Sequence, residues 1–246
     1  MSVTLYGVPL SPFVRKVRLC LQEKGLDYQL ETVMPFTPPD WYYAINPLGR
    51  IPALKDGDCT LADSSVICQY LEEAYPATPT LYGDSAQARG QVRWLEKYAD
   101  YELAPLTTFT VFRNRILKPT SGQPCNEEAV QTAMQQKLPP HFDYLEQQLG
   151  DNDFFVCDRL SMADIAVTCQ LINMSHGGEQ LDAQRWPGLA AHHARMLARP
   201  AIESLLQGAS RAGSSFKGSS IGWGRPGGDR QDRRSGGLAG RRRSGE

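Results

Sequence analysis

Ser11 stands at the junction between a strand-like run, 3–7, and a helical pattern over about 12–24. The first turn of a helix carries unpaired N–H groups and the positive end of the helix dipole, and both favour an anion at that end of the helix. Thiolates are among the anions stabilised in this way. The hydroxyl of Ser11 could therefore donate a hydrogen bond to a sulfur that a ligand brings. Serine is also a preferred N-cap, so the plainer interpretation is that Ser11 only caps the helix.

The four residues Ser11-Pro12-Phe13-Val14 contain no cysteine, so the chain has no sulfur of its own at this point. A Cys-x-x-Cys motif here would indicate a disulfide exchanger. A thiol with an ordinary pKa of about 8.5 commonly loses a unit or more at such a site, and each unit corresponds to about 1.36 kcal/mol. One charge-assisted hydrogen bond together with the helix dipole can supply that amount.

Two other segments could complete a ligand site. Ile51-Pro52 lies where an irregular loop enters a strand, and a cis bond there would leave the backbone N–H and C=O of Ile51 free to pair with an extended peptide. A trans proline that simply starts the strand is the alternative. Asp63 and Ser64 begin the next helical pattern, where they could cap the helix or hold the ammonium and carboxylate of an amino-acid head group. Together the three places supply what a thiol tripeptide needs.

The N-terminal part of the chain alternates short apolar runs with amphipathic ones. Strands are expected at 3–7, at 28–33 and within 51–63, where the Asp56-Gly57 pair indicates a hairpin. A helix is expected over 63–76. This order predicts a small mixed sheet with helices packed on it.

Strand signals disappear after the linker-like segment 77–84. Helices are expected at about 85–117, 126–149, 162–175, 187–198 and 200–207. Ser161 and Asp164 form a variant capping box at the start of one of them. The predicted fold class is therefore α+β followed by all-α, with a mixed domain over 1–80, a helical domain over 85–207 and a tail over 208–246.

Composition separates the tail from the rest of the chain. Residues 208–246 are rich in Gly, Ser and Arg, lack periodicity, and are expected to be disordered. They carry nine basic and three acidic residues, so they could touch RNA or another anionic surface, but a non-functional extension is the favoured interpretation. The remaining residues carry 17 basic and 24 acidic side chains, which gives the folded body no electrostatic footprint for nucleic acid.

The sequence also excludes several other classes of protein. No apolar run approaches the roughly 18 residues needed to span a bilayer, and the N-terminus has no signal-like apolar core, so the protein is predicted to be cytoplasmic. The six cysteines are scattered, which fits free thiols in a reducing compartment. No Cys/His cluster has the spacing of a zinc site, and no metal is predicted.

Taken together, these segments resemble the glutathione transferase superfamily. The matching pieces are 10-LSPFVRKVRL-19, 46-NPLGRIPAL-54, 62-ADSSVICQYLEE-73, 161-SMADIA-166 and 199-RPAI-202, in the family's order across about residues 1–207. The resemblance implies a thioredoxin-like N-terminal domain followed by an all-helical C-terminal domain, a cis bond at Pro52, and a cytosolic homodimer that acts in detoxification. It also implies glutathione as a co-substrate and no separate cofactor.

The resemblance further assigns roles to single residues. Ser11 takes the catalytic hydroxyl position of the serine-type classes. Contacts with glutathione are implied for Phe13, Arg50, Ile51, Pro52, Asp63 and Ser64. In this assignment Ile51 pairs with the peptide backbone, Arg50 lies near the glycine carboxylate, and the Asp63-Ser64 pair holds the γ-glutamyl group. Asp164 matches a structural capping-box aspartate.

The predicted function is glutathione conjugation, in which a thiolate stabilised by Ser11 attacks a small hydrophobic electrophile. The electrophile pocket is expected on the first helix of the second domain, although most of its aromatic residues are expected in the core. The candidates are Tyr98, Tyr101, Leu106, Phe109 and Phe112. A glutathione-dependent isomerase, dehalogenase or peroxidase would use the same thiolate and stays open. So does a non-catalytic binding or regulatory module with the same fold.

Overall fold

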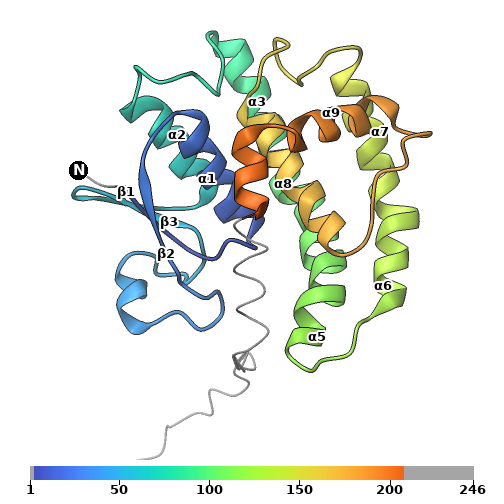
Figure 1. Cartoon of the computed structure of the whole chain (residues 1–246), viewed down its shortest axis with the longest axis horizontal. Coiled ribbons are helices and arrows are strands. Elements are labelled where there is room, and N and C mark those ends of the chain that lie inside the picture. Colours follow the sequence, from blue (N-terminus) through green and yellow to red (C-terminus); the bar gives the residue numbers. More distant parts are fainter. Residues whose placement is uncertain (1–2, 208–246) are drawn as a thin grey trace, which may run out of the picture.

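A four-stranded sheet forms the base of the N-terminal domain. The computed structural model describes residues 3–207 of the chain. The strands are β1 Val3–Tyr6, β2 Tyr28–Glu31, β3 Ala53–Asp56 and β4 Cys59–Ala62, in the spatial order β2-β1-β3-β4. β1 is parallel to β2 and antiparallel to β3, and β3 is antiparallel to β4. Together with α1 Pro12–Glu23 and α2 Ser64–Ala74, this sheet makes the predicted thioredoxin-like domain (Figure 1).

The hairpin between β3 and β4 forms where the Asp56-Gly57 pair predicted it. Asp56 pairs with Cys59 at the closed end, and Gly57 takes a left-handed φ of 59°, which most side chains disfavour. Asp56 also fastens the hairpin to the end of α2. Its Oδ2 atom accepts hydrogen bonds from the hydroxyls of Tyr70 at 3.0 Å and Tyr75 at 2.7 Å.

The domain that follows is built of helices, as predicted. The N-terminal domain itself contains one short helical turn between β2 and β3, η1 Asp40–Ala44. The first long helical segment comprises α3 Ala86–Tyr98, η2 Ala99–Leu103, α4 Ala104–Leu106, η3 Thr107–Leu117 and α5 Lys118–Thr120. The second comprises α6 Glu127–Thr132, η4 Ala133–Lys137 and α7 Leu138–Leu149. They are followed by α8 Met162–His176, α9 Pro187–Leu197 and a last helix over 200–207.

Wide turns interrupt the first helical segment on both sides of Pro105. In η2 and η3 backbone N–H groups reach carbonyls five residues back, as from Ala104 to Ala99 and from Lys118 to Arg113. Proline lacks an N–H group and cannot continue the regular ladder, which favours such a departure. Each wide turn rotates the following side chains relative to a regular α-helix. Regular helical spacing therefore does not predict which aromatic residues of this segment share a face.

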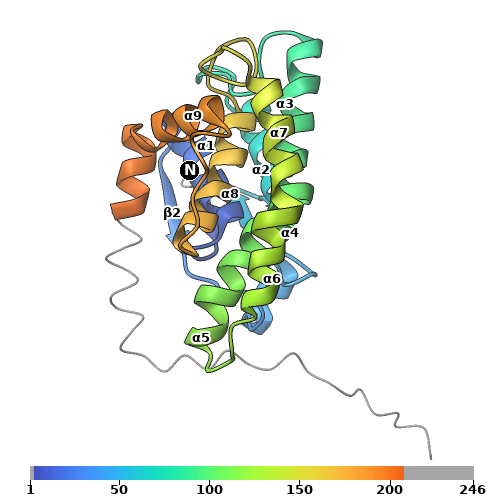
Figure 2. The same cartoon turned by 90° about the vertical axis from the view of Figure 1, so that its right-hand side faces the viewer.

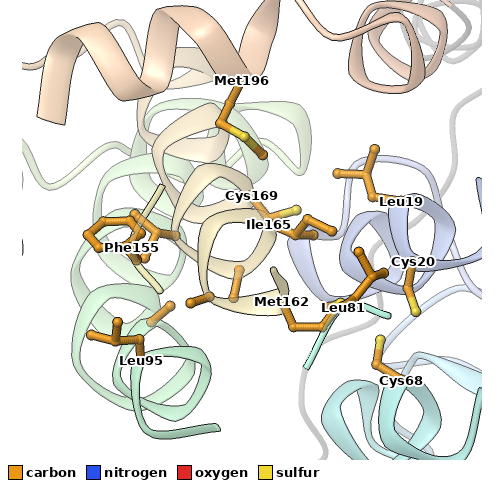
Figure 3. Packing of buried hydrophobic residues seen from close by; sticks show 14 of the residues in the cluster. Leu19, Cys20, Cys68, Leu81, Leu95, Phe155, Met162, Ile165, Cys169 and Met196 are labelled. Atoms are coloured by element: carbon orange, nitrogen blue, oxygen red, sulfur yellow. The ribbon is translucent and has the colours of Figure 1, made fainter. Parts of the chain in front are cut away.

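α8 joins the two domains through apolar packing. It contacts α1, α3, η3 and α9 (Figure 1, Figure 2), and its residues from Met162 to Met174 are all buried. Figure 3 shows Ile165 and Cys169 of α8 facing Leu19 of α1. A helix that is buried all round in this way is a core element rather than a surface helix.

The start of α8 is the predicted capping box. The N–H and the hydroxyl of Ser161 both donate to Asp164 Oδ2 at 2.8 Å. Asp164 Oδ1 accepts from the N–H of Phe155 at 3.0 Å and lies 2.9 Å from His192 Nε2 of α9. The capping box therefore also fixes α9 and the segment before α8.

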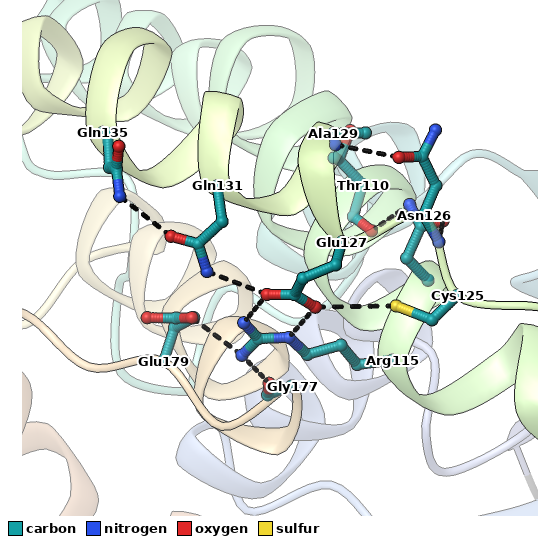
Figure 4. Close-up of polar contacts among 11 residues, drawn as sticks. Thr110, Arg115, Cys125, Asn126, Glu127, Ala129, Gln131, Gln135, Gly177 and Glu179 are labelled. Carbon is teal, nitrogen blue, oxygen red and sulfur yellow. Dashed lines mark hydrogen bonds and ion pairs between the residues drawn. The ribbon is translucent and has the colours of Figure 1, made fainter.

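Arg115 fixes the far end of η3 (Figure 4). Its Nε and Nη2 atoms bind the carboxylate of Glu127 at 3.1 and 2.5 Å. Its Nη1 atom donates to the Gly177 carbonyl at 2.8 Å and lies 2.7 Å from Glu179. One guanidinium thus holds η3 to the start of α6 and to the turn that follows α8.

Two sequence expectations concern membranes and the tail. None of the helices within residues 3–207 has the length and apolar character needed to cross a bilayer. The disorder expected for 208–246 falls on residues outside those that the structure describes.

A buried ion cluster connects α1, α2 and the first helical segment. Lys16 Nζ binds Ser65 Oγ at 3.0 Å, Asp100 Oδ2 at 2.7 Å and Glu96 Oε1 at 3.1 Å. Ser65 Oγ in turn donates to Asp100 Oδ2 at 3.0 Å. Burial by itself lowers the pKa of Lys16, but the two carboxylates outweigh it and the pKa is raised, so the ammonium stays charged. Nothing in the local sequence indicated that this lysine is buried.

Lys16→Met is expected to destabilise the fold strongly. The substitution leaves the Glu96 and Asp100 carboxylates buried without their cation, and breaking a buried pair in this way costs about 3–5 kcal/mol. Urea unfolding followed by circular dichroism measures the loss. Lys55→Met is the matched control, because Lys55 is exposed on β3 and its loss should change stability by about 0.5 kcal/mol or less. Equal stability of the two variants would show that the cluster does not fasten the helices.

Candidate functional site

Ser11 is the N-cap of α1, in extended geometry with φ −70° and ψ 126°. Its Oγ atom accepts a long hydrogen bond of 3.4 Å from the N–H of Val14. The capping interpretation is therefore correct. It does not compete with a role toward a ligand, since the cap uses an oxygen lone pair and leaves the hydroxyl proton free to donate. Ser11 is half-buried, so part of the residue is exposed to solvent.

Gly7 allows the close approach between the end of β1 and α1. A Cβ atom at this position would lie 2.4 Å from Cγ2 of Val14, far inside contact distance. A glycine is therefore required where the chain leaves the sheet and turns toward Ser11. The position of the serine thus depends on the lack of a side chain four residues earlier.

The Ile51-Pro52 bond is cis, as the resemblance implied. Ile51 has no backbone hydrogen-bond partner among residues 3–207. The carbonyl before it, that of Arg50, accepts hydrogen bonds from Tyr42 Oη and Asn46 Nδ2, both at 2.7 Å. Burial is the main cause that raises the pKa of Tyr42 to about 12, so its phenol remains a donor. Sequence analysis missed both donors, because their acceptor is a carbonyl, which every residue has.

Asp63 and Ser64 begin α2. Asp63 Oδ1 caps the helix by accepting from the N–H groups of Ser65 at 2.9 Å and Val66 at 3.2 Å. The φ of Asp63 is 75°, a left-handed value that costs a residue with a side chain about 1–3 kcal/mol and tends to occur at functional sites. Lys97 Nζ of α3 lies 3.8 Å from the same oxygen. Oδ2 has no hydrogen-bond partner among residues 3–207.

Strand register places these segments at one edge of the sheet. Tyr6 pairs with Ala53, and Ala53 pairs with Ala62, so β1 ends, β3 begins and β4 ends side by side. The predicted site residues lie on the segments that continue from these three strand ends. The edge therefore combines a helix N-terminus with a hydroxyl, an unpaired peptide segment and a second helix N-terminus with a carboxylate. The roles implied for Phe13, Arg50, Ile51, Pro52, Asp63 and Ser64 toward glutathione stay predictions.

An aromatic pair lies beside the first of these helix starts. Phe13 of α1 stacks on Phe109 of η3, with ring centroids 6.2 Å apart and planes at 29°. Phe109 is 51% exposed, so one side of the pair faces solvent. Apolar surface next to a thiolate position is what an electrophile site requires.

The other predicted electrophile contacts lie elsewhere. Phe112 is buried in the core, and Tyr101 is 66% exposed under Lys97. The ring of Tyr98 packs against that of Tyr144 of α7 at a tilt of 36°. Leu106 lines a groove of about 250 Å³ between η3 and the second helical segment. Of the five candidates, the structure brings Phe109 to Phe13 and places the other four in different surroundings.

Metal ligands do not cluster in the described part of the chain. No group of three or more His, Cys, Asp or Glu side chains within residues 3–207 is arranged to hold a metal ion. All six cysteines are free, with Cys20, Cys68 and Cys169 buried.

Comparison with known families and proteins identifies this architecture. The profile of the glutathione S-transferase N-terminal domain matches residues 5–79, and that of the C-terminal domain matches residues 112–208. A glutathione S-transferase of Triticum aestivum is 30% identical over 204 residues, which cover 82% of this chain and 92% of the relative. Glutathione S-transferase 3 of Zea mays is 34% identical over 165 residues, covering 65% and 72%.

Solved structures agree with the sequence comparison. A glutathione S-transferase from Rhodospirillum rubrum superposes with a TM-score of 0.75 at 30% identity, covering 83% of this chain and 91% of that one. One from Sinorhizobium meliloti gives 0.74 at 25% identity, covering 84% and 93%. With family profiles on both domains and a 30% identical relative matched over 92% of its length, the chain belongs to the glutathione S-transferase family of enzymes.

Proposed function

We propose that the protein conjugates glutathione to small hydrophobic electrophiles, with Ser11 stabilising the thiolate. The observation that carries the proposal is the shared sheet edge, where the hydroxyl at the start of α1, the unpaired Ile51 segment and the Asp63 cap of α2 come from adjacent strand ends. Membership of the family supports glutathione as the co-substrate. The half-exposed aromatic pair beside Ser11 supports an apolar second substrate.

The proposed chemistry begins when glutathione loses its thiol proton to water. The thiolate then lies at the N-terminal end of α1, where the helix dipole favours it. The Ser11 hydroxyl donates a hydrogen bond to the sulfur and keeps its proton, while Val14 N–H continues to donate to the Ser11 oxygen. The sulfur attacks the electrophilic carbon, a C–S bond forms, and the electron pair of the broken bond leaves with the departing group. Ser11 is a donor to the nucleophile and is not itself the nucleophile.

The peptide portion of glutathione is proposed to follow the sheet edge. Its extended backbone pairs with the free N–H and C=O of Ile51, whose position is set by the hydrogen bonds on the Arg50 carbonyl. The exposed Arg50 side chain is proposed to meet the glycine carboxylate. At the other end, Ser64 and the start of α2 receive the γ-glutamyl carboxylate, and Asp63 Oδ2 receives its ammonium.

The proposed compartment is the cytoplasm. All six cysteines are free thiols, and such a set persists in a reducing environment. Fractionation of the source cells checks this, and recovery in an oxidising compartment would contradict it.

Ser11→Ala is expected to lower kcat/KM for a standard aryl halide by about 10- to 100-fold at pH 6.5. The lost hydrogen bond to a charged sulfur is worth about 1.5–3 kcal/mol, and each 1.36 kcal/mol is a factor of ten. Ser85→Ala is the matched control. Ser85 also caps a helix, since Ala88 N–H donates to its hydroxyl at 3.0 Å, but it lies at the start of α3. A Ser11→Ala enzyme as fast as the wild type would refute the assigned role.

Phe109→Ala is expected to raise KM for an aromatic electrophile by about 2- to 10-fold, because a stacked aromatic contact is worth about 0.5–1.5 kcal/mol. KM for glutathione should stay unchanged. Steady-state kinetics with each substrate varied separates the two effects. Tyr101→Ala is the control, since Tyr101 is an exposed aromatic residue of the same helical segment without contact to Phe13. An equal response of the two variants would remove Phe109 from the electrophile site.

We also propose that two copies associate, as is typical of the family. Val66 of α2 and Trp94 of α3 are large apolar side chains that are 47% and 58% exposed. The start of α2 and the end of α3 meet through the 3.8 Å contact of Asp63 with Lys97, so the two exposed side chains lie on neighbouring helices. Light scattering should give twice the chain mass of 27.3 kDa, and Trp94→Glu should shift the equilibrium toward the single chain. A wild-type monomer at micromolar concentration would contradict the proposal.

A further inference from the structure

Arg15 places a buried guanidinium close to the start of α1. It lies four residues after Ser11, one helical turn deeper on the same face, and is 2% exposed. Its Nη1 atom donates to Asn173 Oδ1 at 2.8 Å and to the Cys169 carbonyl at 3.3 Å, both on α8. Its Nη2 atom is buried and has no hydrogen-bond partner among residues 3–207.

The charge of Arg15 has no counter-charge beside it. Arg15 forms no ion pair with any of residues 3–207, whereas the adjacent Lys16 is paired with both Glu96 and Asp100. Burying an uncompensated charge is costly for a fold. Neutral hydrogen-bond acceptors such as Asn173 Oδ1 lessen this cost but do not cancel the positive charge. Of the two buried cations of α1, Arg15 is thus the one without an acidic partner among residues 3–207.

The titratable groups whose charges act on Arg15 are Cys169 and Arg18, and the Asp100 carboxylate near Cys169 is already bound to Lys16. Burial raises the pKa of Cys169 to about 12, so its thiol is neutral. Burial, with a smaller contribution from Arg15 itself, lowers the pKa of His176 to about 4, so its imidazole is neutral as well. Arg18 on α1 has the same sign as Arg15. Although burial lowers the pKa of Arg15, a guanidinium stays protonated in proteins.

The guanidinium is directed toward the end of α1 that carries Ser11. Long side chains on an α-helix lean toward its N-terminus. The contacts agree, because Leu19 faces Cys169 in Figure 3, whereas Arg15 reaches on to Asn173, closer to the end of α8. α1 and α8 therefore run antiparallel here, and the end of α8 that receives Arg15 lies toward the start of α1.

We propose that Arg15 supplies a fixed positive charge that stabilises the glutathione thiolate at Ser11 through space, without touching it. This inference rests on the proposed function of Ser11. In general, a unit charge about 10 Å from a thiol moves the pKa of that thiol by roughly one unit when the effective dielectric constant is about 20. The effect adds to those of the hydroxyl and the helix dipole.

The competing account is that Arg15 only tethers α1 to α8 through Asn173. The two accounts differ in whether the charge of Arg15 or its hydrogen bond to Asn173 affects the thiolate. If the charge matters, Arg15→Lys retains the effect and Asn173→Leu, which removes the tether acceptor and keeps the charge, leaves the thiolate unaffected. If the tether matters, Asn173→Leu and Arg15→Met behave alike.

The test is a pH titration of the ultraviolet absorbance of the thiolate in enzyme saturated with glutathione. Arg15→Met should raise the pKa of the bound thiol by about one unit, while Arg15→Lys should leave it near the wild-type value. Arg18→Met is the matched control, because Arg18 is a cation of the same helix that is only half-buried and bonds the Tyr28 hydroxyl, where solvent screens its charge. Glutathione affinity by calorimetry and the melting temperature confirm that each variant is folded.

Two results would overturn the inference: an Arg15→Met titration that coincides with Arg18→Met, or an Asn173→Leu titration shifted as far as that of Arg15→Met. Should Arg15→Met not fold, Arg15→Gln retains the hydrogen bond to Asn173 without the charge and must show the same rise. The wild type separates this inference from the proposed function. If the bound thiol of the wild type has the pKa of free glutathione, the role of Ser11 itself is contradicted. If that pKa is lowered in the wild type and is the same in Arg15→Met and Arg15→Gln, only the role of Arg15 is contradicted.

Discussion

The ammonium group of Lys16 is the point on which the arrangement of the site depends. It is buried between α1, α2 and the first helical segment, and it binds Ser65, Asp100 and Glu96 at once. A buried charge cannot lose its partners without a large cost, so the three helices cannot slide past one another freely. Ser11 lies five residues before Lys16 and Ser64 lies directly before Ser65. The cluster therefore fixes the distance between the place proposed for the sulfur and the place proposed for the head group.

α1 combines several functions along one short helix because its faces meet different surroundings. Its first turn meets solvent at the sheet edge and presents the hydroxyl of Ser11. Phe13 turns toward η3 and the aromatic pair, whereas Lys16 turns toward α2 and the carboxylates. Arg15 turns toward α8, where neutral groups receive it. The N-terminal end of the helix, with the positive end of its dipole, stays free for an anionic sulfur.

The features that the sequence predicted correctly are those that depend on residues close together in the chain. The Asp56-Gly57 turn and the capping box at Ser161 depend on neighbours in the chain, and both are present. The burial of Lys16 and Arg15 could not be predicted, because their partners Asp100 and Asn173 lie 84 and 158 residues away. The aromatic face of the first helical segment could not be predicted either, since the wide turns around Pro105 change the rotation between successive side chains. Long-range partners and helical phase are the two kinds of information that local patterns lack.

The central claim is that the hydroxyl at the start of α1 holds a sulfur brought from outside the chain. A crystal structure of the protein with glutathione bound tests it most directly. The account predicts the glutathione sulfur within hydrogen-bond distance of Ser11 Oγ, with the peptide paired to the backbone of Ile51 and the head group at Asp63 and Ser64. A sulfur directed away from Ser11, or a tripeptide bound elsewhere than this sheet edge, would contradict the account and leave only the fold in common with the family.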